Sequence, residues 1–337
     1  MNGLTGHLMV ALACALCSCA PMLRQTAGPE AGFNTPRLEP QAFVSFDGAR
    51  LGLTRWEALG DAPWAVIVGV HGMNDYANAF HLAGPWWAAR GVTTYAYDQR
   101  GFGRSPGRGI WAPDAATTED LRTLVTLARR RHPGALIAVV GESLGGAVAV
   151  EAFASDRPPD ADRLILVAPA VWGWTSQPLI NRATLWLAAH IAPGRVFAPP
   201  RWLTNHIAPT DNIAELRAMS RDPLLIWGAR ADALYGLMNT MQRAQRRMAA
   251  LPANTLYLYG AHDQVIPKSP TRLAARRLPP EDRSAYYDKG WHLLLADLQA
   301  PTVWGDVLAF IHAPTDPLPS KAPEIVRALA RFTPPGA

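Results

Sequence analysis

The chain has 337 residues, of which 49% are hydrophobic and 18% are charged, and its net charge is +5. This composition is typical of a globular protein with a large buried core, and the length suits one large domain with an insertion, or two domains. The arginines are scattered along the chain rather than gathered in one stripe, which argues against nucleic acid as a partner.

The three cysteines, Cys14, Cys17 and Cys19, all lie at the start of the chain. The remaining sequence therefore has no disulfide framework and no thiolate metal site. Residues 8–16 form an apolar run that is shorter than the roughly 20 residues that a helix needs to span a bilayer. The run has the length of the hydrophobic region of a signal peptide.

Residues 16–19 read Leu-Cys-Ser-Cys and resemble the end of a bacterial lipoprotein signal, in which Cys19 becomes the lipidated first residue of the mature protein. Residues 1–19 are therefore predicted to be a signal peptide, and the protein is expected to be exported and anchored to a membrane of the cell envelope. The stretch from Met1 to His7 contains no Lys or Arg, so an alternative stays open. In that alternative, a leader is cleaved near Ala20 and the protein is soluble in the periplasm or secreted.

Residues 20–40 are rich in proline, glycine and polar side chains and predict a flexible tether. Fully extended, the tether would reach about 70 Å, at roughly 3.3–3.6 Å per residue. Such a tether would free an anchored domain from the membrane surface.

Between residues 41 and 170, short apolar runs with strand character alternate with helical patterns. In chain order, the expected elements are a hairpin within 43–56 that turns at Asp47-Gly48, a strand at 64–70, a helix at 78–89, a strand at 92–97, a helix at 117–131, a strand at 135–140, a helix at 147–154 and a strand at 164–167. This alternation predicts an α/β fold with a mostly parallel, twisted sheet and helices on both faces.

The alternation breaks between residues 171 and 248, where the sequence is helix-like, interrupted by proline and rich in tryptophan. A structureless loop of that length is improbable in a compact domain, so we expect an inserted helical cap. The tryptophans could line an apolar tunnel or simply pack the cap onto the sheet. The sheet then resumes with a strand at 255–259, a helix at 270–278, a strand at 283–287 and a helix at 301–311. Residues 41–170 and 249–312 thus form the expected core, and 313–337 a proline-rich tail with a short helix at 324–332.

The stretch Gly141-Glu-Ser-Leu-Gly145 lies between an expected strand and an expected helix. A Gly-x-Ser-x-Gly motif in this context is typical of a turn that exposes a nucleophilic serine above a sheet. A serine hydroxyl is a weak nucleophile unless a base takes its proton, so Ser143 requires a base, an acid to orient the base, and an oxyanion hole elsewhere in the chain.

Five segments in this order resemble the α/β-hydrolase superfamily, and specifically its monoacylglycerol lipase and lysophospholipase branch. The resemblance covers about residues 40–312, including the position of the cap. The five segments are His71-Gly72, Asp98-Gln-Arg-Gly-Phe-Gly-Arg-Ser105, Gly141-Glu-Ser-Leu-Gly145, Gly260-Ala-His-Asp263 and Gly290-Trp-His292.

The resemblance implies a catalytic triad in which Ser143 is the nucleophile, His292 the base and Asp263 the acid that orients it. Asp288, four residues before His292, is the alternative acid. The backbone amides of Met73 and Leu144 would form the oxyanion hole.

One neighbour of this set has another expected role. His71 resembles a structural histidine of the oxyanion loop. Many relatives have a Glu-His-x-x-Arg-Tyr-like run after His-Gly, whereas this chain has residues 74–78, Asn-Asp-Tyr-Ala-Asn. The detailed geometry of that loop is therefore open.

The resemblance implies a serine ester hydrolase that cleaves a lipid-like ester, such as a monoacylglycerol or a lysophospholipid, through an acyl-enzyme and without a metal or an organic cofactor. Acyl transfer or other chemistry on the same triad is an alternative. Dehalogenases and epoxide hydrolases of this fold are disfavoured because they carry Asp where Ser143 stands. A non-catalytic lipid-binding lipoprotein is the alternative from another class. The sequence leaves the oligomeric state open.

Overall fold

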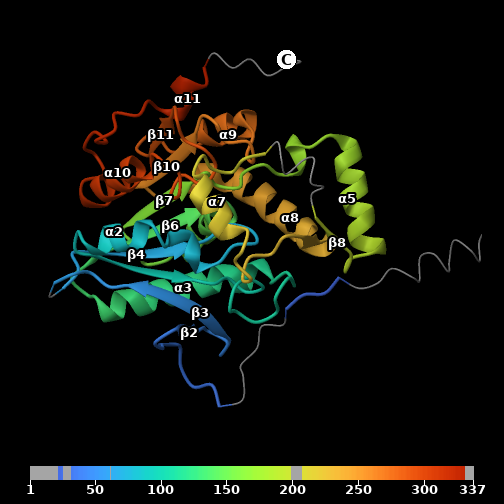
Figure 1. Ribbon diagram of the computed structural model, residues 1–337, viewed down its shortest axis with the longest axis horizontal. Helices are drawn as coiled ribbons and strands as arrows, with labels where there is room; N and C mark the ends of the chain where they lie inside the picture. Colours follow the sequence, from blue (N-terminus) through green and yellow to red (C-terminus); the bar gives the residue numbers. More distant parts are fainter. Residues whose placement is uncertain (1–21, 26–31, 61, 199–206, 331–337) are drawn as a thin grey trace, which may run out of the picture.

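The structure is a computed structural model that describes residues 22–25, 32–60, 62–198 and 207–330 (Figure 1). The expected signal peptide, with Cys19, lies outside these residues. In the described part of the chain, no helix combines the length and the apolar character needed to cross a bilayer. Figure 1 shows a central sheet with helices packed on both of its faces.

Within the described residues the central sheet has nine strands, in the spatial order β1-β2-β3-β5-β4-β6-β7-β10-β11. The pairs from β1 to β5 are antiparallel, and all pairs from β5 to β11 are parallel. The strands are β1 (Arg37–Leu38), β2 (Ala42–Val44), β3 (Arg50–Trp56), β4 (Ala65–Val70), β5 (Val92–Tyr97), β6 (Leu136–Glu142), β7 (Arg163–Val167), β10 (Thr255–Gly260) and β11 (Arg283–Tyr287). Since β5 and β6 lie on opposite sides of β4, the chain reverses direction across the sheet there, and ligands of open α/β sheets bind at such a switch point.

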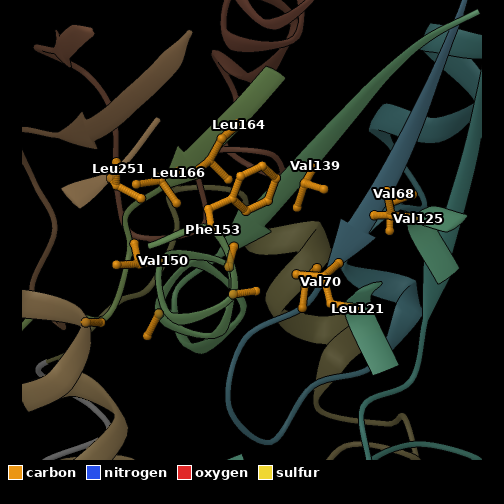
Figure 2. Close-up of a cluster of buried hydrophobic side chains, with 14 of the residues drawn as sticks. Val68, Val70, Leu121, Val125, Val139, Val150, Phe153, Leu164, Leu166 and Leu251 are labelled. Carbon is orange, nitrogen blue, oxygen red and sulfur yellow. The ribbon is translucent and has the colours of Figure 1, made fainter. Parts of the chain in front are cut away.

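The parallel strands carry continuous apolar sequences because helices cover them on both faces. On one face, Val68, Val139 and Leu164 from three neighbouring strands pack beneath α3 and α4 (Figure 2). On the other face, Ile67 packs with Phe310. The helices of the first face are α3 (Asp114–Arg131), α4 (Leu144–Phe153), α8 (Ala231–Arg247) and α9 (Lys268–Ala275), and those of the second are α2 (Ala83–Ala88) and α10 (Ala300–His312).

The expected strands are confirmed, and each begins and ends within two residues of its expected position. The expectation of one helix over residues 78–89 is wrong, because the chain forms a 3₁₀ turn at Ala77–Phe80 and then the separate helix α2. Pro85 explains the break, since a proline inside a helix removes a hydrogen bond and its ring clashes with the carbonyl four residues earlier, here that of His81. Gly84 also lies against Trp56, where a Cβ atom would come within 2.4 Å of the indole.

The segment between residues 171 and 248 is helical where it is described, with α5 (Leu179–Ile191), α7 (Ile213–Met219) and α8. It also contains an antiparallel ribbon of two short strands, β8 (Val196–Phe197) and β9 (Ala229–Arg230), separate from the main sheet. α8 packs against α4, so it connects this segment to the core. The short helix α11 (Ile325–Ala328) follows in the tail, and its Ile325 is fully buried against the core.

The described parts of the expected tether are bound to the folded domain rather than free. The Leu23 amide donates a hydrogen bond to Asp232 Oδ2 (3.2 Å), at the start of α8. The Gln25 amide donates to the Trp111 carbonyl (3.2 Å), and β1 pairs with β2. A freely extended tether over residues 20–40 is therefore not what these segments form.

A buried ionic network connects the β2–β3 hairpin to α3. The Arg100 guanidinium donates to both carboxylate oxygens of Asp47 and to both of Asp120, each at 2.7 Å. All three side chains are at most 4% exposed. Because both carboxylates are removed from water, the guanidinium is required to compensate their charge.

We predict that Arg100→Met lowers the free energy of unfolding by about 3–5 kcal/mol, because it leaves two buried carboxylates without a counter-charge. Urea denaturation measures this effect. The control is Arg50→Met, which removes an exposed ion pair with Glu39 and should cost less than about 1 kcal/mol. Equal losses in the two variants would contradict the interpretation.

Candidate active site

Ser143 occupies the sharp turn between β6 and α4. Its backbone has φ 49° and ψ −114°, a left-handed conformation that residues other than glycine rarely adopt. Two glycines make the turn possible, because a Cβ atom on Gly145 would lie 2.0 Å from the Val70 carbonyl oxygen and one on Gly141 would lie 2.6 Å from the Gly145 carbonyl oxygen. Backbone strain of this kind costs about 1–3 kcal/mol and persists only where the surrounding packing imposes it.

The neighbouring strand β7 and the loop after it hold this turn in place. The Ser143 amide donates to the Val167 carbonyl (3.0 Å), and the Ser143 carbonyl accepts from the Ala170 amide (2.8 Å). Ser143 is also the residue before the first turn of α4, where unpaired amides and the helix dipole favour negative charge. The position therefore suits a group that becomes attached to a negatively charged intermediate.

His292 and Asp263 are brought together by the loops that follow β11 and β10. His292 Nδ1 lies 2.9 Å from Asp263 Oδ2, and both side chains are buried. The other carboxylate oxygen, Oδ1, accepts from the amides of Val265 (2.7 Å) and Ile266 (2.8 Å), so the carboxylate is held in one orientation. Asp288, the alternative acid, is exposed and makes no hydrogen bond with His292.

Ser143 lies at the same edge of the sheet as this pair. Glu142 and Leu293, the residues next to Ser143 and His292 in sequence, line one small cavity, so the two segments lie on either side of it. Within the described residues the Ser143 hydroxyl makes no hydrogen bond. Bonds of this kind are often long or poorly aligned in an enzyme without substrate and tighten only in the complex.

Two backbone amides near Ser143 are free to bind an anion. Among the described residues, neither the Met73 amide nor the Leu144 amide donates a hydrogen bond to a protein acceptor. The loop that carries Met73 passes directly beside Ser143, because a Cβ atom on Gly72 would lie 3.3 Å from Ser143 Cβ. Free donors on both sides of a serine are what an oxyanion hole requires.

His71 fixes the loop that carries Met73. The Gln99 amide donates to His71 Nε2 (2.8 Å), so the proton lies on Nδ1, which donates to the Gly72 carbonyl (2.7 Å). Burial lowers the pKa of His71 to about 4, against the opposing effect of the Asp98 charge. The imidazole is therefore neutral at pH 7, and both of its nitrogens are already used in holding the loop.

A segment of the cap is bonded to the loops that carry Asp263 and His292, and nothing in the sequence pattern indicated this. Four hydrogen bonds connect residues 208–212, which we call the cap segment, to these loops. They join the Ala208 amide to Gln264 Oε1 (2.9 Å), the Leu293 amide to the Pro209 carbonyl (2.9 Å), Asn212 Nδ2 to the Ala296 carbonyl (3.0 Å) and the Leu298 amide to Asp211 Oδ1 (2.9 Å). The positions of the two loops thus depend on the position of the cap.

Asp297 is a second unexpected feature of the histidine loop. Its Oδ2 accepts from the amide of Trp291 (2.7 Å), the residue before His292. Burial raises the pKa of Asp297 to about 6, although the Trp291 hydrogen bond opposes that shift. The side chain holds the backbone next to His292 and so acts on the position of the imidazole.

Carboxyl groups gather in the small cavity beside Ser143. Its walls include Asp75, Glu142 and Glu215. Burial raises the pKa of Asp75 to about 7, and it raises that of Glu142 well above its usual range, with the charge of Asp75 adding to the effect. Asp75 and Glu142 are therefore largely protonated in mildly acidic solution, and no sequence motif marks them.

The fold and this arrangement define an α/β-hydrolase. The sequence matches the serine aminopeptidase S33 family, Hydrolase_4, over residues 61–299, and the chain belongs to this family. Because the match covers most of the described core and the segment between residues 171 and 248, it includes every candidate site residue except Cys19.

The chain is also similar to known lipases. It is 29% identical to a monoacylglycerol lipase of Mycolicibacterium smegmatis, over 80% of this chain and 95% of that protein. It is 25% identical to the monoglyceride lipase of Rattus norvegicus, over 82% and 89%. A solved monoglyceride lipase of Saccharomyces cerevisiae has the same fold, with a TM-score of 0.67 at 18% identity, over 87% of this chain and 98% of that one. By class, the protein is a serine ester hydrolase.

We predict that Asp75→Asn makes the protein more stable at pH 8 than the wild type, with a smaller difference at pH 5. As the pH rises from about 3.8 to 7, the Asp75 carboxyl group ionises in the unfolded protein before it ionises in the folded protein, because its pKa is raised by folding. The wild type therefore loses stability over that pH range. A pKa shift of this size corresponds to about 4 kcal/mol. The gain in stability should be smaller, because part of Asp75 faces the cavity. Urea denaturation at both pH values tests this, and a difference independent of pH would contradict it.

We predict that Asp297→Leu lowers kcat on a short soluble ester by about 10- to 100-fold with little change in KM, since a small displacement of the imidazole disturbs the reaction more than binding. Asp297→Asn keeps an oxygen for the Trp291 amide and should restore most of the rate. If the two variants have the same kcat, Asp297 does not act by positioning this loop.

Proposed function

We propose that the protein hydrolyses carboxylic esters of long-chain fatty acids, with monoacylglycerols as the preferred substrates, through an acyl-enzyme. The observation that carries the proposal is a cavity of about 320 Å³ that opens beside Met73 of the candidate oxyanion loop. Most of its walls are apolar and come from the cap, and they include Phe197, Leu225, Ile226 and Trp227. Its volume lies within the usual range of ligand pockets, about 300–1,000 Å³.

In this proposal, Asp263 accepts the Nδ1 proton of His292 in a hydrogen bond, which leaves the Nε2 lone pair free. Nε2 takes the proton of the Ser143 hydroxyl as its oxygen attacks the ester carbonyl carbon. The amides of Met73 and Leu144 bind the resulting oxyanion. The intermediate collapses, His292 protonates the departing alcohol, and the acyl group remains on Ser143.

Water then completes the cycle. His292 takes a proton from a water molecule, whose oxygen attacks the acyl carbon, and collapse of the second intermediate releases the fatty acid and returns the proton to Ser143. Transfer of the acyl group to an alcohol other than water uses the same residues. The ratio of fatty acid to transfer product therefore decides between hydrolysis and acyl transfer.

Two alternatives to a monoacylglycerol substrate need separate arguments: a peptide, which the family description suggests, and a lysophospholipid. An aminopeptidase would bind a charged amino terminus next to the reacting carbonyl, whereas the cavity beside Met73 is mostly apolar and favours an acyl chain. Lysophospholipids share the acyl chain of monoacylglycerols but add a charged headgroup, so comparing the two with a common acyl chain decides between them. A non-catalytic lipid-binding protein would bind these molecules and hydrolyse none.

We also propose that the protein is exported and anchored through a lipid on Cys19. This proposal rests on the lipoprotein-like signal at residues 16–19. Fractionation of cells that express the wild type or Cys19→Ala tests it, because the substitution should release the protein from the membrane fraction. Recovery of the wild type in the soluble fraction would contradict it.

We predict that Ser143→Ala lowers kcat on a monoacylglycerol by about 10⁴-fold or more, because the nucleophile is lost. The matched control, Ser269→Ala, replaces an exposed serine of α9 and should keep wild-type activity. A series of p-nitrophenyl esters and monoacylglycerols of increasing chain length, with an aminoacyl p-nitroanilide as comparison, measures the specificity. A preference for acetate or for the anilide would refute the proposed substrate, and equal rates for wild type and Ser143→Ala would refute the nucleophile.

A further inference from the structure

One loop beside the candidate site is shaped to receive a side chain from the start of the described chain. This loop is residues 101–111, which we call the glycine loop. Gln25 Nε2 donates hydrogen bonds to the loop carbonyls of Ile110 (2.9 Å) and Gly107 (3.4 Å). A Cβ atom on Gly107 would lie 2.5 Å from Gln25 Cδ, and the Gly107 φ of 75° is strained for other residues. The backbone of the loop therefore accommodates Gln25 because position 107 is glycine.

The same N-terminal residues are also bonded to the first turn of α8. We call residues 22–25 the N-terminal strap. The Leu23 amide donates to Asp232 Oδ2 (3.2 Å), and the Arg24 guanidinium donates to the Asp232 carbonyl (3.5 Å). The Asp232 side chain is fully buried and also accepts from the Arg230 guanidinium (2.7 Å), so it is itself held in place. The strap thus joins the glycine loop to α8, two elements that are far apart in the sequence.

The glycine loop and α8 form two walls of one apolar cluster. Phe102 and Trp111 of the loop pack with Ala233 of α8 in this cluster. Leu144 of α4 belongs to the same cluster, and Met73 packs against it. Met73 and Leu144 carry the two amides that donate to no protein acceptor among the described residues. The packing of the cluster therefore bears on both donors of the candidate oxyanion hole.

A second contact connects the glycine loop to the loop that carries Met73. The Phe102 ring lies edge-on to the His71 ring, with centroids 5.6 Å apart, and His71 holds the Met73 loop by its two hydrogen bonds. Met73, Ile110 and Trp111 also line a small cavity, so side-chain packing alone does not fill the space between the two loops. The bonds of the strap therefore limit how far the glycine loop can move relative to Met73.

We propose that the N-terminal strap positions the candidate oxyanion hole through Gln25. Gln25 is a positioning residue, because it holds the glycine loop against α8 and so fixes the apolar cluster on which Met73 and Leu144 pack. It touches neither the substrate nor the reacting atoms. An oxyanion hole is effective only when its amides lie about 2.7–3.1 Å from the charge that develops in the transition state. A small displacement of the cluster should therefore slow the reaction while substrate binding changes little.

This inference rests on the proposed function, because it takes the two free amides as the oxyanion hole of ester hydrolysis. The connection of the strap to the glycine loop and the Met73 loop does not depend on that reaction. Amide hydrogen exchange measures the connection without any substrate. In the glycine loop the Gly109 amide donates to the Gly101 carbonyl (2.8 Å), so its exchange reports how often the loop opens.

The test compares the full chain as wild type, Gln25→Met and Gln41→Met. Methionine is similar in size to glutamine but has no hydrogen-bond donor, so Gln25→Met removes the side-chain bonds to the glycine loop. The matched control alters Gln41, which is exposed and whose side chain forms no hydrogen bond among the described residues. Exchange is followed in residues 72–75 and 101–111, and kcat and KM are measured on p-nitrophenyl butyrate. The affinity of a trifluoromethyl ketone, whose adduct with Ser143 carries an oxyanion, is the third measurement.

In Gln25→Met we expect exchange in both segments to be at least about threefold faster than in the wild type and in Gln41→Met. The kcat should fall about tenfold with KM within about twofold, and the affinity for the ketone should fall by the same factor as kcat. This loss is smaller than the roughly 10²- to 10³-fold for removal of an oxyanion-hole donor, since Arg108 also bonds the glycine loop to residues 223–225 of the cap. Urea denaturation should show that both variants are fully folded under the assay conditions.

Three results would overturn the proposal. Unchanged exchange in the glycine loop would show that the strap does not hold it. Faster exchange with kcat and ketone affinity equal to those of Gln41→Met would show that the loop does not position the amides. A change in KM alone would place the effect in substrate binding. A wild type that hydrolyses no ester refutes the proposed function, and exchange in residues 72–75 then decides on the strap, which is refuted if exchange is unchanged and supported if it is faster.

Discussion

The contact between α4 and the end of β4 is the constraint on which the site depends. Gly145 lies so close to the Val70 carbonyl that no side chain fits between them, and Ser143 is forced into a left-handed backbone conformation. That conformation is maintained because β6 and β7 are fixed by a core buried on both faces of the sheet. The same contact brings the Met73 loop next to Ser143, so Ser143 and both free amides are positioned by one piece of backbone packing.

The other half of the site depends on the cap. Asp263 and His292 follow neighbouring strands, but their loops are also bonded to residues 208–212, which belong to the cap. The cavity beside Met73 is lined by cap residues as well. A ligand that changes the position of the cap would thus act on the loop that holds the His292 imidazole.

The strands and the Gly-x-Ser-x-Gly turn could be predicted because their signals are local. A strand covered on both faces is a continuous apolar run, and the turn needs glycine at fixed positions. The split of the helix over residues 78–89 could also have been foreseen from Pro85. The family resemblance favoured Asp263 over Asp288 as the partner of His292, and in the structure His292 lies against Asp263. The small cavity lined by carboxyl groups and the hydrogen bonds of the cap segment involve residues far apart in the chain, so no local sequence pattern indicates them.

The composition of α5 is compatible with a fully buried helix and with a partly exposed one, and only its surroundings distinguish the two. As a sequence it is an apolar stretch that a cap could bury completely, and this interpretation accounts for its tryptophan and leucines equally well. In the structure α8 covers only one side of it, so the other side meets solvent. Large apolar side chains in that position destabilise a water-exposed surface unless something covers them.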